Sequence, residues 1–153
     1  MNLSYALPLL GTIVAGAAVS LQPAFNGQLA AHLGSPFRAA LVSFTAGALT
    51  LLVVVSALAF RTGLPSTERV ANTPIHLFIV GGMLGALFVS TAAWATPKIG
   101  AGAFFATLIA AQLIVSLVID HFGLIGLDAR PANLVRIGGV VLLIAGGWMV
   151  VRG

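Results

Sequence analysis

The chain has 153 residues, of which 59% are hydrophobic and 7% are charged, and its mean hydropathy is +1.12. Soluble domains carry about 25% charged residues, so this composition excludes a water-soluble fold and indicates an integral membrane protein. The Lys and Arg residues are spread along the chain rather than clustered, which excludes the pattern of a nucleic-acid-binding surface. Cysteine is absent, which excludes disulfides and thiolate metal sites.

Five long apolar stretches follow one another along the chain. About 20 helical residues cross the hydrocarbon core of a bilayer, and each stretch reaches that length. Backbone polar groups in lipid must pair within their own segment, and no stretch alternates like a barrel strand, so we predict an all-α bundle. The predicted helices, in a single transmembrane domain over residues 1–153, are Ser4–Phe25, Pro36–Phe60, Pro74–Ala95, Gly100–Phe122 and Asn133–Val151.

Prolines and turn residues set the predicted boundaries. Pro36 stands at a helix start, where its missing N–H costs nothing. Pro23 removes a backbone hydrogen bond, so we expect the first helix to bend or end there. Residues 96–99 are interpreted as a tight connection and residues 61–73 as a loop of ordinary turn residues. The first apolar stretch lacks a basic leader, so we expect a retained helix rather than a signal peptide.

Basic residues are divided almost evenly between the two sides of the membrane. Five spans place the termini on opposite sides, which we call the N-terminal face and the C-terminal face. The N-terminal face carries Arg61, Arg69, Arg130 and Arg136, and the C-terminal face carries Arg38, Lys98 and Arg152. Because a Lys and Arg excess normally sets orientation, two interpretations stay open: one weakly favoured orientation, or insertion in both. In the second case, opposite copies pair as an antiparallel homodimer, the unfused form of an inverted repeat.

Polar residues inside the predicted spans are the candidate binding residues. Such side chains usually face the bundle interior or a water-filled cavity. They fall into groups that share one helix and are spaced by about one turn. We predict that the substrate-binding lining consists of Gln22, Asn26, Trp94, Gln112 and Ser116. The alternative, which weighs equally for Gln112, is interhelical hydrogen bonding worth roughly 0.6 kcal/mol for each contact.

Asp120 and His121 close the fourth predicted helix near the membrane interface. There Asp120 can stay hydrated and pair with Arg130 or Arg136. We assign Asp120, His121 and Arg136 a structural or coupling role, with a proton relay as the alternative for Asp120. The sequence has no catalytic pair, histidine ligand spacing or phosphate-binding glycine loop, so we expect no enzyme activity, no metal and no cofactor. The first helix lacks an acid, which favours a neutral, weakly polar or anionic substrate over a cation.

Several short segments together form a recognisable pattern. The most specific stretch is AQLIVSLVIDHFG at residues 111–123. The other segments are residues 20–29 (SLQPAFNGQL), 34–36 (GSP), 42–47 (VSFTAG), 81–85 (GGMLG), 96–100 (TPKIG) and 136–139 (RIGG). With these segments the chain resembles the YdcZ family over essentially its whole length, except that Ala111 replaces the glycine that the family usually has.

The resemblance implies membership of the drug/metabolite transporter superfamily in a bacterial inner membrane. The family is similar to the small multidrug resistance proteins in being half-size, and it occurs as single genes, adjacent pairs and fused ten-helix proteins. It therefore implies a dimer with inverted symmetry. The small multidrug resistance proteins use a glutamate in their first helix, which this chain lacks, so their proton-exchange mechanism does not carry over.

Together these observations predict a transporter half that acts as an antiparallel homodimer of ten helices. Its mechanism would be alternating access to a small-molecule site near the bilayer midplane, lined by both copies. The alternative is a non-transporting membrane scaffold, or a subunit that needs a different partner chain.

Overall fold

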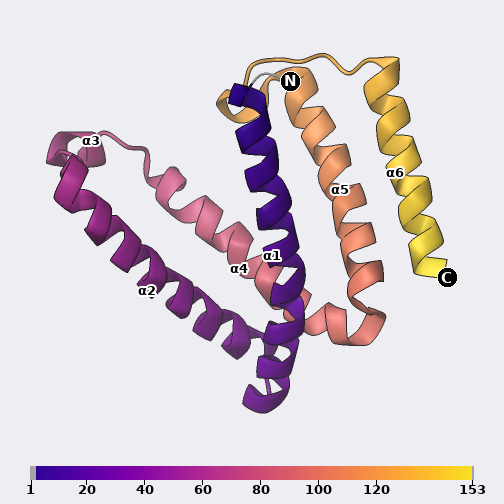
Figure 1. Cartoon of the computed structure of the whole chain (residues 1–153), viewed down its shortest axis with the longest axis horizontal. Coiled ribbons are helices and arrows are strands. Elements are labelled where there is room, and N and C mark those ends of the chain that lie inside the picture. The colour runs from indigo at the N-terminus through magenta and orange to yellow at the C-terminus, as the bar shows by residue number, and fades with distance from the viewer. Residues whose placement is uncertain (1–2, 153) are drawn as a thin grey trace. The chain divides into compact units, whose positions relative to one another are not determined.

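The computed structural model describes the backbone of residues 3–152 and the side chains of residues 6–152. Within these residues every regular element is a helix (Figure 1): α1 (Leu3–Leu33), α2 (Pro36–Thr62), α3 (Thr67–Ala71), α4 (Ile75–Ile99), α5 (Ala101–Phe122), the 3-10 helix η1 (Leu124–Gly126) and α6 (Leu134–Arg152). In this described part, α1, α2, α4, α5 and α6 are long and apolar enough to cross a membrane. The prediction of an all-α protein with five spans is therefore confirmed.

The chain divides into two compact units, which we call the N-terminal unit (residues 1–97) and the C-terminal unit (residues 98–153). In the N-terminal unit, α2 and α4 run side by side in opposite directions, joined by the segment that holds α3 (Figure 1). They approach closely where a Cβ added at Gly85 of α4 would lie 3.1 Å from the Phe44 ring of α2. In the C-terminal unit, α5 packs against α6.

Helix α1 continues through Pro23 to Leu33, so the prediction that it ends near Phe25 is wrong. Pro23 is fully buried. In lipid, backbone groups cannot pair with water, so the helical hydrogen bonds on both sides of Pro23 are kept. The one carbonyl that Pro23 leaves without a donor can be satisfied by neighbouring groups. The helix ends instead at Gly34, whose φ of 67° is in the left-handed region that favours glycine. Ser35 then caps α2, accepting the backbone N–H of Arg38 at 3.4 Å.

Helix α4 likewise includes Pro97 and ends at Ile99. The predicted connection at residues 96–99 is therefore wrong, because the break between α4 and α5 is confined to Gly100. Gly100 has a φ of 81°, a backbone conformation that residues with a Cβ rarely adopt. The extra helical turn keeps Thr96 and Pro97 within the membrane-spanning helix.

The segment predicted as a plain loop contains the short helix α3. Its N-terminus is capped by Ser66, whose hydroxyl accepts the backbone N–H of Arg69 at 3.4 Å. Five residues are too few to show a helical hydrophobic period, so only the capping serine could have indicated this turn.

Small side chains form the buried core of the N-terminal unit. Outside α1, the buried residues of this unit are Ala39 and Ala40 of α2, and Val89, Ser90, Ala92, Ala93, Ala95 and Thr96 of α4. Helices α1 and α4 are in contact at Gly27, where an added Cβ would lie 2.8 Å from Cγ of Pro97. Between helices in lipid, small residues allow the backbones to approach and pack.

Candidate functional site

A buried amide in the N-terminal unit joins α1 to α2. Asn26 of α1 is only 3% exposed, and the Ser43 hydroxyl of α2 donates a hydrogen bond to its side-chain oxygen. Gln22, one turn earlier on α1, is exposed and lines a groove of about 270 Å³. Ser43 lines the same groove, together with Phe44, Gly47, Ala48 and Leu51. The structure thus brings two predicted binding residues, Gln22 and Asn26, to one serine.

Ser43 is a polar residue of this site that the sequence prediction missed. A hydroxyl in an otherwise apolar span is a weak signal, because serine also serves as a small packing residue between helices. Its pairing with Asn26 depends on how α1 and α2 cross, which no spacing within one helix reveals.

Two buried polar atoms of this unit remain unpaired. Among the side chains that the structure describes, neither Nδ2 of Asn26 nor Oγ1 of Thr96 has a hydrogen-bond partner. Thr96 is 7% exposed. Buried polar groups are nearly always satisfied in proteins, so each exception requires an explanation.

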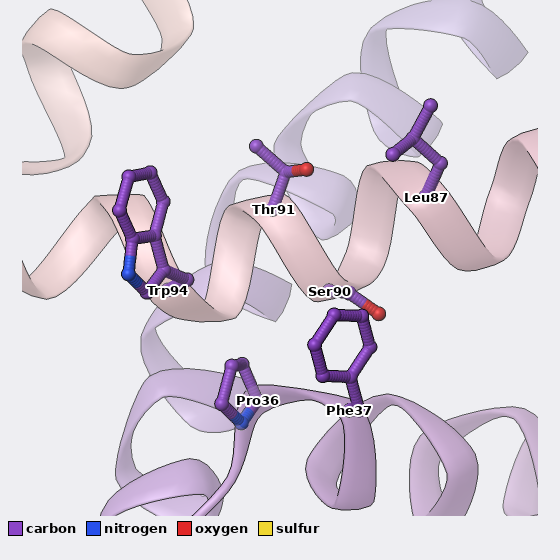
Figure 2. A pocket seen from close by; sticks show the side chains of 6 residues that line it. All are labelled: Pro36, Phe37, Leu87, Ser90, Thr91 and Trp94. Carbon is purple, nitrogen blue, oxygen red and sulfur yellow. The ribbon is translucent and has the colours of Figure 1, made fainter.

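Trp94 lies in a different groove of the N-terminal unit, between α4 and the start of α2. Figure 2 shows Leu87, Thr91 and Trp94 along α4, with Pro36 and Phe37 of α2 facing this segment. The groove has a volume of about 260 Å³, and Ser90 completes its lining. Most of its surface is apolar side chain, and Trp94 is 55% exposed. Trp94 therefore does not share the groove of Gln22.

Ser116 and Arg136 line a groove of about 250 Å³ in the C-terminal unit. The other lining residues are Leu113, Leu117, Gly139, Val140 and Leu143. The Ser116 hydroxyl donates to the carbonyl of Leu113 at 3.0 Å, so its proton is already used within α5. Gln112 is exposed and lines neither this groove nor the second α5–α6 groove, which is formed around Ala106 and Trp148.

Asp120 of α5 forms an ion pair with Arg136 of α6, one of the two partners that the sequence predicts. Arg136 also donates to the carbonyl of Arg130 at 2.7 Å, and the backbone N–H of Arg130 donates to the carbonyl of Asp120 at 2.7 Å. Both charged side chains are about one-third exposed, so the ion pair itself contributes about 0–1 kcal/mol.

His121 completes this network, because its Nδ1 accepts the backbone N–H of Ala132 at 3.0 Å. Asp120, His121 and Arg136 thus hold the connection between α5 and α6 in place. Within residues 6–152, no group of three His, Asp or Glu side chains lies close enough to hold a metal ion.

Comparison with known proteins identifies the family to which this sequence is similar. Residues 7–149 match the family described as "Putative inner membrane exporter, YdcZ". The chain is also similar to the inner membrane protein YdcZ of Escherichia coli strain K12, with 31% identity over 102 residues, which cover 67% of this chain and 68% of that protein. No solved structure matches the chain. With its five apolar helices, the chain is a multi-pass inner membrane protein and belongs to the YdcZ family.

Proposed function

We propose that the chain is one half of an exporter, and that two copies in opposite orientations form the transporting unit. Its family is described as that of an inner membrane exporter. The main observation behind the inverted pair is the near-equal division of Lys and Arg between the N-terminal and C-terminal faces. With five spans, either orientation satisfies the usual basic excess almost equally well.

The polar residues of the spans support a second copy. Gln22, Gln112 and Ser116 lie within membrane-spanning helices, yet their side chains are exposed. Exposure of amides to lipid is costly, and such residues normally face a bundle interior or an aqueous cavity. An inverted partner would cover these surfaces, and alternating access would proceed at the interface of the two copies.

The chemistry of the proposed lining, in which Ser43 joins Gln22 and Asn26, supports a neutral or anionic small molecule as substrate. Gln22, Asn26 and Ser43 offer neutral donors and acceptors. Arg136, which lines a groove of the C-terminal unit, is neutralised by its ion pair with Asp120. A cation would require an unpaired carboxylate within the spans, but α1 has none and Asp120 of α5 is paired with Arg136. The residues of the lining are thus those that select by hydrogen bonding rather than by charge.

A flux measurement tests this proposal even though the substrate is unidentified. Purified protein would be reconstituted into liposomes loaded with a bacterial metabolite extract, and the retained metabolites would be measured by mass spectrometry. We expect selective loss of at least one neutral or anionic metabolite with the wild-type chain alone. Asn26→Leu should suppress this loss, whereas Ser56→Ala, an exposed position on α2, should retain it.

Uniform retention of all metabolites by the lone chain would contradict the proposal. If the same liposomes then lost a metabolite only after a second, different chain was added, the protein would be a subunit of a hetero-oligomer. If folded protein gave no flux in either case, a scaffold would be the better explanation.

A further inference from the structure

The two unpaired buried atoms lie on adjoining helices at one crossing. Asn26 immediately precedes Gly27 on α1, and Thr96 immediately precedes Pro97 on α4. Gly27 and Pro97 are in direct contact, since an added Cβ at Gly27 would lie 2.8 Å from Cγ of Pro97. The residues that carry these two unpaired atoms are therefore the immediate chain neighbours of the two residues in contact, and both belong to the N-terminal unit.

A third polar group faces this crossing. Pro97 has no N–H, so the carbonyl of Ala93, one turn earlier in α4, loses its usual helical donor. That carbonyl oxygen lies 3.7 Å from the position of an added Cβ on Gly27, and so it points toward α1. In transmembrane helices, a carbonyl freed by proline is normally satisfied by a neighbouring polar side chain or by an ordered water.

We propose that Asn26, Thr96 and the Ala93 carbonyl form a binding site for a single hydroxyl group. A hydroxyl accepts from the Nδ2 of Asn26 and donates to the Ala93 carbonyl, while the Thr96 hydroxyl can do either. These are the two to four partners that a buried water requires. The hydroxyl belongs either to a bound water or to a neutral solute in transit, and the second source rests on the proposed transport function.

This site favours the neutral part of the substrate range proposed above. None of the buried side chains of the described chain is ionisable, so a bound ion would have no counter-charge inside the core. An isolated charge in such a place is far more costly than a hydrogen-bonded neutral group. The Ser43 hydroxyl already donates to the side-chain oxygen of Asn26, so the unpaired group of this amide is Nδ2, which can only donate to a ligand.

Nuclear magnetic resonance of the full chain in lipid nanodiscs tests this site directly. The chain has four asparagines, Asn2, Asn26, Asn72 and Asn133, so asparagine-selective ¹⁵N labelling gives few side-chain signals. Asn26→Leu identifies the Asn26 signal by its disappearance. We expect a rotating-frame cross-peak between the Asn26 Nδ2 protons and a hydroxyl-bearing species, either water or glycerol added as a neutral hydroxyl probe.

Variants of Thr96 locate the partner. Thr96→Val should shift the Asn26 side-chain signal, whereas Thr91→Val, an exposed position on the same helix, should leave it unchanged. Thr96→Ser keeps the hydroxyl and should preserve the wild-type signal, so the site remains testable even where Thr96→Val fails to fold.

The outcomes separate the two sources of the hydroxyl. If the water cross-peak persists when glycerol is added, the hydroxyl belongs to a structural water. If a glycerol cross-peak replaces it and saturates with glycerol concentration, the hydroxyl site binds a solute. The proposal would be overturned if neither cross-peak were observed and if the chemical shift of the Asn26 side chain were the same in Thr96→Val as in the wild type. Because none of these readouts requires flux, failure of this site and failure of the exporter proposal are distinguishable.

Discussion

The Ser43 hydroxyl of α2 donates its hydrogen bond to the side-chain oxygen of Asn26 on α1, an amide that is almost completely buried. This contact joins two consecutive spans through side chains rather than through backbone. It also sets the orientation of the amide, because it leaves Nδ2 directed away from Ser43.

Ser43→Ala should lower the free energy of unfolding by about 1 kcal/mol, because it leaves a buried amide oxygen without its donor. Thermal unfolding in detergent or nanodiscs measures the change. Ser56→Ala is the matched control, since Ser56 lies exposed on the same helix and its loss should change stability by less than about 0.5 kcal/mol. Equal effects of the two variants would show that the Ser43–Asn26 contact contributes nothing to stability.

Gly27→Ala should destabilise the N-terminal unit by about 1–3 kcal/mol, because the new Cβ would lie 2.8 Å from the Pro97 ring. Gly16→Ala on the same helix is the control, because no atom lies within 4 Å of a Cβ added there. Its stability should be unchanged or slightly raised, since alanine is the better helix former. A Gly27→Ala variant that unfolds at the wild-type temperature would contradict the close approach of α1 and α4.

A double-mutant cycle measures the contribution of the Asp120–Arg136 ion pair. We expect a coupling energy of at most about 1 kcal/mol, because both side chains are about one-third exposed. Arg136→Gln should cost more than Asp120→Asn, since Arg136 also donates to the Arg130 carbonyl. The double variant should be no less stable than Arg136→Gln alone, and strictly additive losses would rule out the coupling.

Adjacent glycines on α6 provide a matched pair for the C-terminal unit. A Cβ at Gly147 would lie 3.4 Å from the carbonyl oxygen of Ala106 on α5, whereas a Cβ at Gly146 meets nothing within 4 Å. Gly147→Val should therefore destabilise the protein by about 1–3 kcal/mol relative to Gly146→Val. Both variants place the same β-branched residue in the helix, so helix propensity cancels. Thermal unfolding of the two variants side by side gives the difference, and equal melting temperatures would refute the packing of α5 on α6 at this point.

The number of spans could be predicted from the sequence because lipid leaves the backbone no alternative to a helix. The break between α1 and α2 is also encoded locally, in a glycine for the left-handed end, a capping serine and Pro36 at the first helical position. The errors at Pro23 and Pro97 have one cause. Proline terminates helices where water can satisfy the freed groups, and inside a membrane both helices continue through it.

The candidate site was predictable only where it lies along one helix. The four-residue spacing places Gln22 beside Asn26 on α1, and it places Ser116 one turn before Asp120 on α5. The roles of Ser43 and Thr96 depend on helix crossings between residues far apart in the chain, which sequence spacing does not encode. For the same reason the groove that Trp94 of α4 shares with Phe37 of α2 could not be predicted from the sequence.

Cysteine labelling of intact cells tests the inverted pair most directly. The chain has no cysteine, so Thr67→Cys on α3 and His32→Cys in the last turn of α1 each introduce a single thiol, one on the N-terminal face and one on the C-terminal face. Both positions are exposed. If copies insert in both orientations, a membrane-impermeant maleimide will label both variants to a similar extent. Labelling of only one variant in intact cells, with both reactive after permeabilisation, would contradict the antiparallel homodimer.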